Sequence, residues 1–154
     1  MIGDPHVVTR ILAIPALTKL VFLDTNILMY AADRGGQEVE KAKIAREIIR
    51  QEDYCTSGQV LEEFFYNVTR KGTHVMSSAL ALGWVRQIAL KPCQAIDSQL
   101  VEAAIGLSTR NQISYWDGAI IAAAERLGAR LLYTEDLNHN QIYGTVTARN
   151  PFLS

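Results

Sequence analysis

The sequence of 154 residues has few of the features that mark specialised protein classes. Only two cysteines are present, Cys55 and Cys93, and neither has a nearby Cys or His partner at the spacing of a zinc site. This excludes a disulfide-rich secreted scaffold and a zinc finger, and it favours a cytoplasmic chain with two reduced, structural thiols. No apolar run approaches the roughly 20 residues that a membrane-spanning helix needs, so we expect no membrane partner.

The chain also lacks an excess of charge, internal repeats and Gly/Ser-rich linkers. It carries 15 basic and 16 acidic residues, and this net charge of −1 gives no broad affinity for nucleic acid. With 49% apolar and 20% charged residues, it is neither disordered nor collagen-like nor a coiled coil. We therefore expect one globular domain over residues 20–154. Residues 1–19 hold an apolar stretch that Pro15 interrupts, which makes a poor signal peptide, and we interpret them as an N-terminal extension.

What the chain does have is a regular alternation of short apolar runs and amphipathic segments. The predicted strands cover residues 20–23, 54–56, 94–96, 130–134 and 145–148. The predicted helices cover residues 26–32, 37–50, a segment that Ser57 caps, and residues 77–90, 97–110 and 116–127. This order predicts an α/β protein, a three-layer α/β/α sandwich with a central, mostly parallel sheet. In such sheets the functional site lies beyond the carboxyl ends of the strands, near a switch in strand order.

Carboxylates stand at two of these strand ends. Asp24 directly follows the first predicted strand, and Asp136 follows the strand of residues 130–134. The simpler interpretation is that each aspartate caps the helix or turn that comes next, which is a frequent role for this residue. The alternative is that both carboxylates belong to one site at the same edge of the sheet.

A third aspartate lies in the first turn of a predicted helix. At about 100° per residue, Asp117 shares the buried helix face with Ile120, Ile121 and Ala124. A buried carboxylate is costly unless it is paired or binds a metal. A capping box with Ser114 would also explain its position, and both roles are compatible.

Two neighbouring glutamates, Glu62 and Glu63, follow in the helix capped by Ser57. They lie at roughly equal angles on either side of its apolar stripe, so helix geometry does not choose between them. Carboxylates gathered at one sheet edge repel one another unless a cation lies among them. An all-oxygen ligand set suits Mg²⁺ or Mn²⁺ and not zinc, and carboxylate-held metal ions are used to cleave phosphodiesters.

Five segments, in the same order as in that family, resemble the motifs of PIN-domain proteins, and the nearest group is the VapC-type toxins of bacterial toxin–antitoxin pairs. The segments are FLDTNIL at 22–28, QVLEEF at 59–64, SYWDGAIIAAA at 114–124, TEDL at 134–137 and NPF at 150–152. Many relatives have Ala where Gly118 stands, and the residues Asn138, His139 and Asn140 replace a Gly that is common after the fourth motif.

The resemblance implies a PIN-like fold and a Mg²⁺-dependent endoribonuclease, with Mn²⁺ as a possible substitute, that leaves a 5′-phosphate and a 3′-hydroxyl. It implies an RNA substrate, a homodimer and a cognate antitoxin protein. It selects Glu63 over Glu62, and the implied catalytic and metal-binding residues are Asp24, Glu63, Asp117 and Asp136. The implied supporting residues are Thr25, Asn26, Thr134 and Glu135.

Charge and aromatic residues fit RNA binding only in part. Neutralising four acids with metal leaves 15 basic against 12 acidic residues, a mildly cationic balance. The basic candidates are Arg70, Lys71, Arg86, Lys91 and Arg110. Four aromatic residues could stack on bases, although their helical spacing favours core or interface packing: Tyr30, Tyr66, Tyr115 and Trp116.

Two other functions compete with the nuclease interpretation. A phosphatase of the haloacid dehalogenase type also has an Asp at the end of its first strand, but it needs a second Asp two residues later, where this chain has Asn26. A PIN-like interaction module without catalysis has no reason to keep a full set of repelling carboxylates.

Overall fold

The computed structural model describes residues 19–70 and 75–153, so nearly all of the expected extension at residues 1–19, and Lys71, lie outside the described residues. The strands of the described part are β1 Val21–Leu23, β2 Tyr54–Ser57, β3 Cys93–Gln94, β4 Leu131–Tyr133, β5 Ile142–Tyr143 and β6 Val146–Arg149. Its helices are α1 Thr25–Ala32, α2 Val39–Gln51, α3 Gly58–Val68, α4 Ser78–Ile88, α5 Ser98–Asn111 and α6 Tyr115–Arg126.

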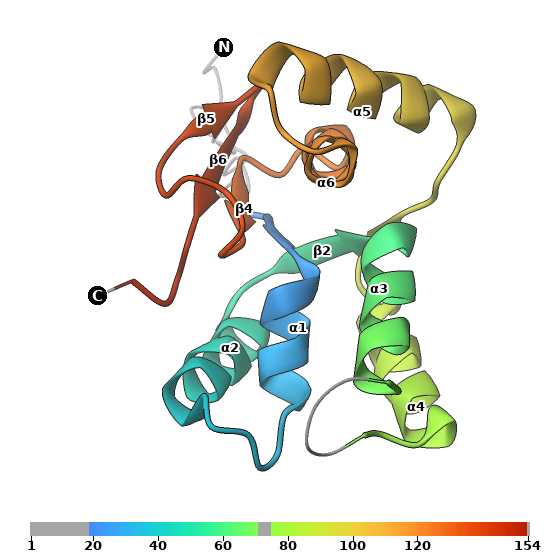
Figure 1. The fold of residues 1–154 in the computed structure, drawn as a ribbon, viewed down its shortest axis with the longest axis vertical. Helices are drawn as coiled ribbons and strands as arrows, with labels where there is room; N and C mark the ends of the chain where they lie inside the picture. Colours follow the sequence, from blue (N-terminus) through green and yellow to red (C-terminus); the bar gives the residue numbers. More distant parts are fainter. Residues whose placement is uncertain (1–18, 71–74, 154) are drawn as a thin grey trace, which may run out of the picture.

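The six strands form one sheet in the order β3-β2-β1-β4-β6-β5. All neighbours pair in parallel except β5 and β6, which are antiparallel. Figure 1 shows α5 and α6 above β2 and α1 to α4 below it, with β5 and β6 to the left of α5 and α6. α6 packs against β2, β4 and β6, and α5 packs on α6. The structure therefore confirms the predicted three-layer α/β fold with a mostly parallel sheet.

The apolar strands are buried because helices cover both faces of the sheet. All three residues of β1 and all four of β2 are buried, and Phe22, Leu23 and Cys55 have no exposed surface. Such strands read as continuous apolar runs and not as alternating patterns, which is why residues 20–23 stood out in the sequence.

Local capping signals predicted the helix ends correctly. Ser57 and Ser114 each accept a hydrogen bond from the backbone N–H three residues later, and Asp97 accepts one from the Leu100 N–H at 2.7 Å. Gly128 follows α6 with a positive φ of 76°, as expected for the residue after a helix C-cap.

The sequence prediction missed β5 and misplaced β3. β5 has only two residues, Ile142 and Tyr143, and pairs with β6 across the turn at Gly144, which has a φ of 60°. β3 is Cys93–Gln94 and not residues 94–96. Strands of two residues carry too little periodicity to be located, and pairing with a neighbouring strand decides them.

Gly118 stands where many PIN-like sequences have Ala, and the packing of α6 against α5 explains the glycine. A Cβ at this position would lie 2.5 Å from the backbone oxygen of Ala104 and 3.1 Å from the Cβ of Ser108, both on α5. The absence of a side chain thus allows α6 to approach α5 closely at the end that carries Asp117.

Candidate active site

The strand order brings the segments after β1 and β4 together. β1 pairs with β2 on one side and with β4 on the other. The chain continues from β1 to β2 on one side and from β4 to β5 and β6 on the other side of the sheet. Asp24 follows β1 and Thr134 follows β4, at the carboxyl ends of the two strands. This is the switch point at which open α/β sheets place their sites.

Asp24 is the most buried carboxylate near this point, with 6% of its surface exposed. It caps α1 by accepting from the Thr25 N–H at 2.7 Å, and it also accepts from the Thr134 hydroxyl at 2.7 Å. Burial is the largest cause that raises the pKa of Asp24, with smaller contributions from the charges of Asp136 and Glu63. These effects outweigh the two hydrogen bonds and raise the pKa from 3.8 to about 7. The capping role and the site role therefore coincide in one side chain.

Asn26 links Asp24 to the segment after β4. Its amide nitrogen donates to Asp136 Oδ2 at 3.1 Å and lies 3.4 Å from Asp24 Oδ2. Its amide oxygen is buried and has no hydrogen-bond partner among the described residues. A buried acceptor of this kind is costly unless a cation or a water molecule binds it.

Glu63 and Glu62 differ in their surroundings, although both lie at similar angles to the apolar stripe of the helix. Glu63 is half-buried and accepts from the Thr25 hydroxyl at 3.0 Å and from the Gln59 amide at 2.9 Å. Glu62 is exposed. Gln59, one turn earlier on the same face of α3, also lies 3.4 Å from the backbone oxygen of Trp116 at the start of α6.

Asp117 stands apart from the other three acids. It is half-buried, its N–H donates to the Ser114 hydroxyl at 3.0 Å, and this hydroxyl lies 2.7 Å from Asp117 Oδ2. The expected capping pair is present, with the carboxylate bound to the hydroxyl of Ser114 and not to its backbone N–H. Through Gln59 and the Trp116 carbonyl, the start of α6 is nevertheless tied to Glu63.

Three of the four predicted acids thus belong to one hydrogen-bonded row of residues, in which Thr25 donates its backbone N–H to Asp24 and its hydroxyl to Glu63. We call it the acid row: Asp136, Asn26, Asp24, Thr25, Glu63 and Gln59. Thr134 braces this row by donating to Asp24 and by accepting from the Asp136 N–H at 3.1 Å. Gln59 was missed in the sequence, although its spacing of four from Glu63 on one helix was the available signal.

Glu135 does not join the acid row. It accepts from the Tyr30 hydroxyl at 2.7 Å and forms an ion pair with Lys41 at 3.0 Å. Lys41 also lies 4.9 Å from the centre of the Tyr30 ring. Glu135 therefore ties the segment after β4 to α1 and α2 and faces away from the carboxylates that it was expected to support.

The donor set is chemically suited to a hard divalent cation, because it consists of carboxylates and the unpartnered Asn26 amide oxygen. In the conformation described for residues 19–70 and 75–153, however, no three His, Cys, Asp or Glu side chains lie close enough together to hold a metal ion. The acids are instead held by hydroxyl and amide groups. Asp24, Asp136 and Glu63 are near-neighbours in the acid row, and Asp117 is the acid that stays outside it.

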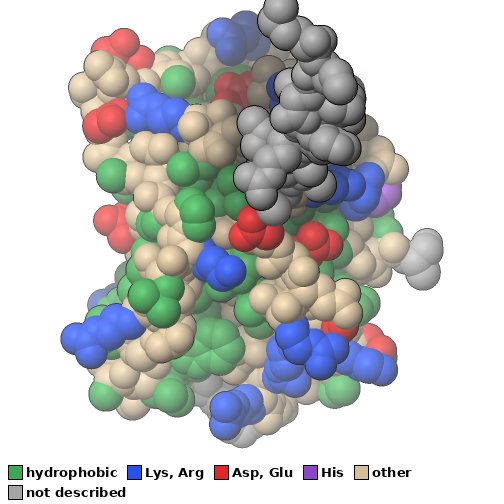
Figure 2. Space-filling view, turned by 180° about the vertical axis from the view of Figure 1, so that it is seen from behind, with side chains coloured by type: hydrophobic (Ala, Val, Ile, Leu, Met, Phe, Trp, Pro, Cys, Tyr) green, Lys and Arg blue, Asp and Glu red, His purple; other side chains and the backbone are tan. Residues whose placement is uncertain are grey.

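The charge on one face of the molecule is mixed. Figure 2 shows acidic and basic side chains interspersed over the face seen from behind, with Lys and Arg gathered at the lower right of the view. A mixed surface of this kind gives weak, non-directional attraction to a polyanion.

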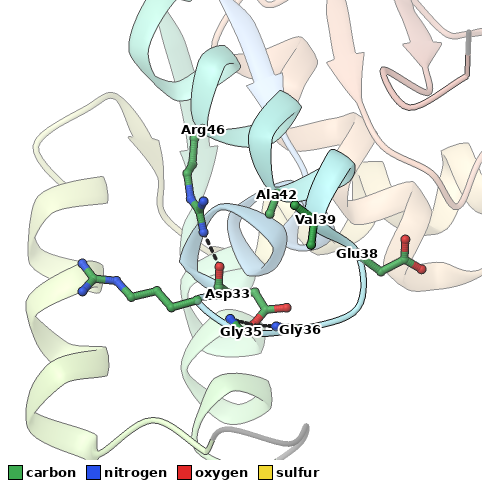
Figure 3. A pocket seen from close by; sticks show the side chains of 8 residues that line it. Asp33, Gly35, Gly36, Glu38, Val39, Ala42 and Arg46 are labelled. Atoms are coloured by element: carbon green, nitrogen blue, oxygen red, sulfur yellow. Dashed lines mark hydrogen bonds between the residues drawn. The ribbon is translucent and has the colours of Figure 1, made fainter.

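Two cavities open on the described surface. One, of about 480 Å³, adjoins the acid row and is lined by Gln59, Glu62, Glu63, Tyr66, Asn67 and Trp116. The other, of about 360 Å³, lies at the loop between α1 and α2 (Figure 3). There Asp33 accepts from the N–H groups of Gly35 and Gly36, and Arg46 donates to the Ala31 and Asp33 carbonyls. The first cavity is the better candidate for a site, because Gln59 and Glu63 of the acid row line it.

No helix of the described segments is long and apolar enough to cross a membrane. No curated protein matches the sequence. Solved structures with a similar fold include the Mycobacterium tuberculosis toxin VapC20, which cleaves the sarcin–ricin loop (TM-score 0.62, 20% identity, 75% of this chain and 89% of that chain). They also include VapBC2 from Rickettsia felis bound to a promoter DNA fragment (TM-score 0.58, 16% identity, 85% and 98%) and FitAcB from Neisseria gonorrhoeae (TM-score 0.60, 15% identity, 86% and 98%).

These likenesses show a shared fold. The sequence model of the PIN domain matches residues 21–144, which contain the first four motifs and end before the segment at 150–152. That range covers most of the chain and includes every acid of the candidate site. The chain belongs to the PIN domain family.

Proposed function

We propose that this PIN domain is a divalent-metal-dependent endoribonuclease, with Mg²⁺ as its ion and Mn²⁺ as a substitute. The observation that carries the proposal is the acid row at the switch point of the sheet. It places Asp24, Asp136 and Glu63 in one hydrogen-bonded network and leaves the Asn26 amide oxygen without a partner.

Asp24 and Asp117 are the proposed principal ligands, and Glu63 and Asp136 complete the acidic site. A divalent ion among such groups activates water and stabilises the leaving oxygen of a phosphodiester. Thr134 and the Thr25 N–H hold the Asp24 carboxylate in position, while the Thr25 hydroxyl and Gln59 hold Glu63. Orientation of ligands by such neighbours is a general feature of metal sites.

The test is cleavage of a mixed-sequence RNA by the purified full-length chain with Mg²⁺, with Mn²⁺ and with excess EDTA. We expect internal cuts that leave 5′-phosphate and 3′-hydroxyl ends, and no cuts in EDTA. Asp24→Asn and Asp117→Asn should both abolish cleavage. Undiminished cleavage in EDTA would contradict the metal dependence.

A silent interaction module is the second candidate, because no three acids of the described chain lie together at metal-binding distance. The same assay separates the two functions. Loss of cleavage in both aspartate variants supports the nuclease, whereas an inactive wild type with every RNA and both metals supports the silent module.

We further propose that the protein acts in the cytoplasm as a homodimeric toxin of a type II toxin–antitoxin pair. The similar solved structures include the toxin–antitoxin complexes VapBC2 and FitAcB, which supports a protein partner. Expression of the wild type should arrest growth, and expression of Asp24→Asn should not. Co-expression of a small protein encoded beside it should restore growth, and light scattering of the purified chain should give twice the monomer mass.

A further inference from the structure

The cavity beside the acid row has aromatic walls that are open to solvent. Trp116, at the start of α6, is 62% exposed, and Tyr66, on α3, is 52% exposed. Both line the same groove as Glu63, and the groove is therefore continuous with the proposed site. The helical spacing favours core or interface packing for these residues, and the exposed surface of both rings excludes burial in the core of the described chain.

Neighbouring side chains support both rings. Trp116 meets Tyr115 edge to face, with 5.1 Å between ring centres and 75° between ring planes. The Arg70 guanidinium lies 4.5 Å from the centre of the Tyr66 ring. Arg70 thus places a positive charge beside Tyr66, where a phosphate backbone leaving the groove would meet it.

The rest of the groove is polar. Gln59 spans from Glu63 to the Trp116 carbonyl and joins α3 to α6 at the base of the groove. Asn67 and Glu62 complete the lining with an amide and a carboxylate. The cavity of about 480 Å³ is in the range of small-molecule sites, which extends from roughly 300 to 1,000 Å³.

We propose that this aromatic groove, lined by Gln59, Glu62, Glu63, Tyr66, Asn67 and Trp116, is a subsite for one unpaired RNA nucleotide next to the scissile phosphodiester. The inference rests on the proposed nuclease function and adds a substrate class to it. The base stacks on Trp116 or Tyr66, and the Asn67 amide meets the base edge. Because bases within a duplex do not present their faces, the groove selects single-stranded or looped RNA.

The polar lining disfavours an apolar protein segment as the occupant. An apolar peptide face pressed onto Trp116 and Tyr66 would remove the Glu62 carboxylate from water without a cationic partner, which is unfavourable. A nucleotide has both parts in one molecule, an apolar base face and polar edges. The continuity of the groove with Glu63 also requires an occupant that reaches the acid row.

The fluorescence of Trp116 tests stacking directly. The chain has two tryptophans, and Trp84 packs against Phe64 at 6.1 Å between ring centres. In a Trp84→Phe variant, Trp116 is the single emitting tryptophan. We expect a single-stranded RNA hexamer, titrated with Ca²⁺ in place of Mg²⁺ and recovered intact, to quench this emission saturably. The same sequence as a duplex should leave it nearly unchanged.

A binding assay with labelled RNA and the full-length chain provides a second readout in case Trp84→Phe fails to fold. Trp116→Ala and Tyr66→Leu should each weaken binding of the single strand by about 5- to 100-fold. Ile105→Ala is the matched control, since Ile105 is 53% exposed on α5 and lies outside the groove. It should change the affinity less than twofold.

The outcomes separate the two proposals. Normal RNA cleavage together with unquenched emission and unchanged affinity of both aromatic variants would overturn the subsite and leave the nuclease intact. Failure of the wild type to bind or cut any RNA would overturn both. A change in Trp116 emission with protein concentration alone, without RNA, would show that a second copy fills the groove and would also overturn the subsite.

Discussion

The two sides of the candidate site are built differently. On the side of β1 and β4, Asp24 is buried, accepts two hydrogen bonds of 2.7 Å and is bridged by Asn26 to Asp136. On the side of α3 and α6, Glu63 and Asp117 are half-buried and are held by longer or more local contacts. The sheet side is the more deeply buried and more closely hydrogen-bonded of the two, and burial raises the pKa of Asp24 there, whereas the helix side is more open to solvent. A divalent ion would therefore be organised by the first and completed by the second.

The largest expected effect on RNA cleavage distinguishes Glu63 from its neighbour Glu62 on α3. Glu63→Gln should lower RNA cleavage by about 10² or more, because it removes a charge from the site, while Glu62→Gln should change it little. Single-turnover rates of both variants with saturating Mg²⁺ provide the measurement. If Glu62→Gln has the larger effect, the acid row does not describe the functional arrangement of α3.

The position of the helix side depends on the close approach of α6 to α5. Gly118→Ala would place a methyl group 2.5 Å from the Ala104 carbonyl oxygen, so the helices must separate. We expect a loss of about 1–3 kcal/mol in the free energy of unfolding, together with reduced cleavage because Asp117 and Trp116 move. Urea denaturation measures the first quantity. Gly83→Ala is the control, since a Cβ there meets nothing within 4 Å, and it should not destabilise the protein.

The smallest expected effect is a difference in stability between two variants, each of which loses one threonine hydroxyl, one on each side of the site. Thr134→Val removes the buried donor to Asp24, and Thr25→Val removes the donor to the half-buried Glu63. Because water can replace the second bond more readily, Thr134→Val should destabilise the metal-free protein more, by about 1 kcal/mol. Equal losses in chemical denaturation would mean that the two sides are equally well organised.

Local chemistry explains what the sequence could predict. Ser57, Asp97 and Ser114 cap helices through contacts within three residues, and Gly128 ends α6 with a positive φ, so short patterns sufficed for the helix ends. The apolar run at 20–23 and the Asp that follows it also predicted the strand and the sheet edge correctly.

What could not be predicted depends on distant contacts. Nothing near Asn26 in the sequence shows that its amide reaches Asp136, 110 positions later, or that its oxygen is left without a partner. Glu135 follows Thr134 directly, yet it accepts hydrogen bonds from Tyr30 on α1 and Lys41 on α2, which lie about 100 positions earlier in the sequence. The exposure of Trp116 likewise follows from how α6 meets α3.

The central claim is that Asp24 is a strained site carboxylate and not merely a helix cap, and its titration provides the test. Its pKa of about 7 when folded exceeds the unfolded value of 3.8, so the folded chain binds this proton more tightly. The stability that the neutral form contributes is complete below about pH 4 and is lost as the pH rises to about 7. Asp24→Asn cannot ionise at this position, so it does not lose this stability as the pH rises.

The decisive measurement is a set of thermal melts of wild type and Asp24→Asn at pH 4.5 and pH 8, each with EDTA and with millimolar Mg²⁺. In EDTA at pH 8 the variant should be more stable by at least about 1 kcal/mol, or roughly 2–4 °C, and this advantage should shrink at pH 4.5. Mg²⁺ at pH 8 should stabilise the wild type and scarcely affect the variant. If Asp24→Asn melts lower than wild type at both pH values and gains as much from Mg²⁺, Asp24 is a structural cap and the proposed site is wrong.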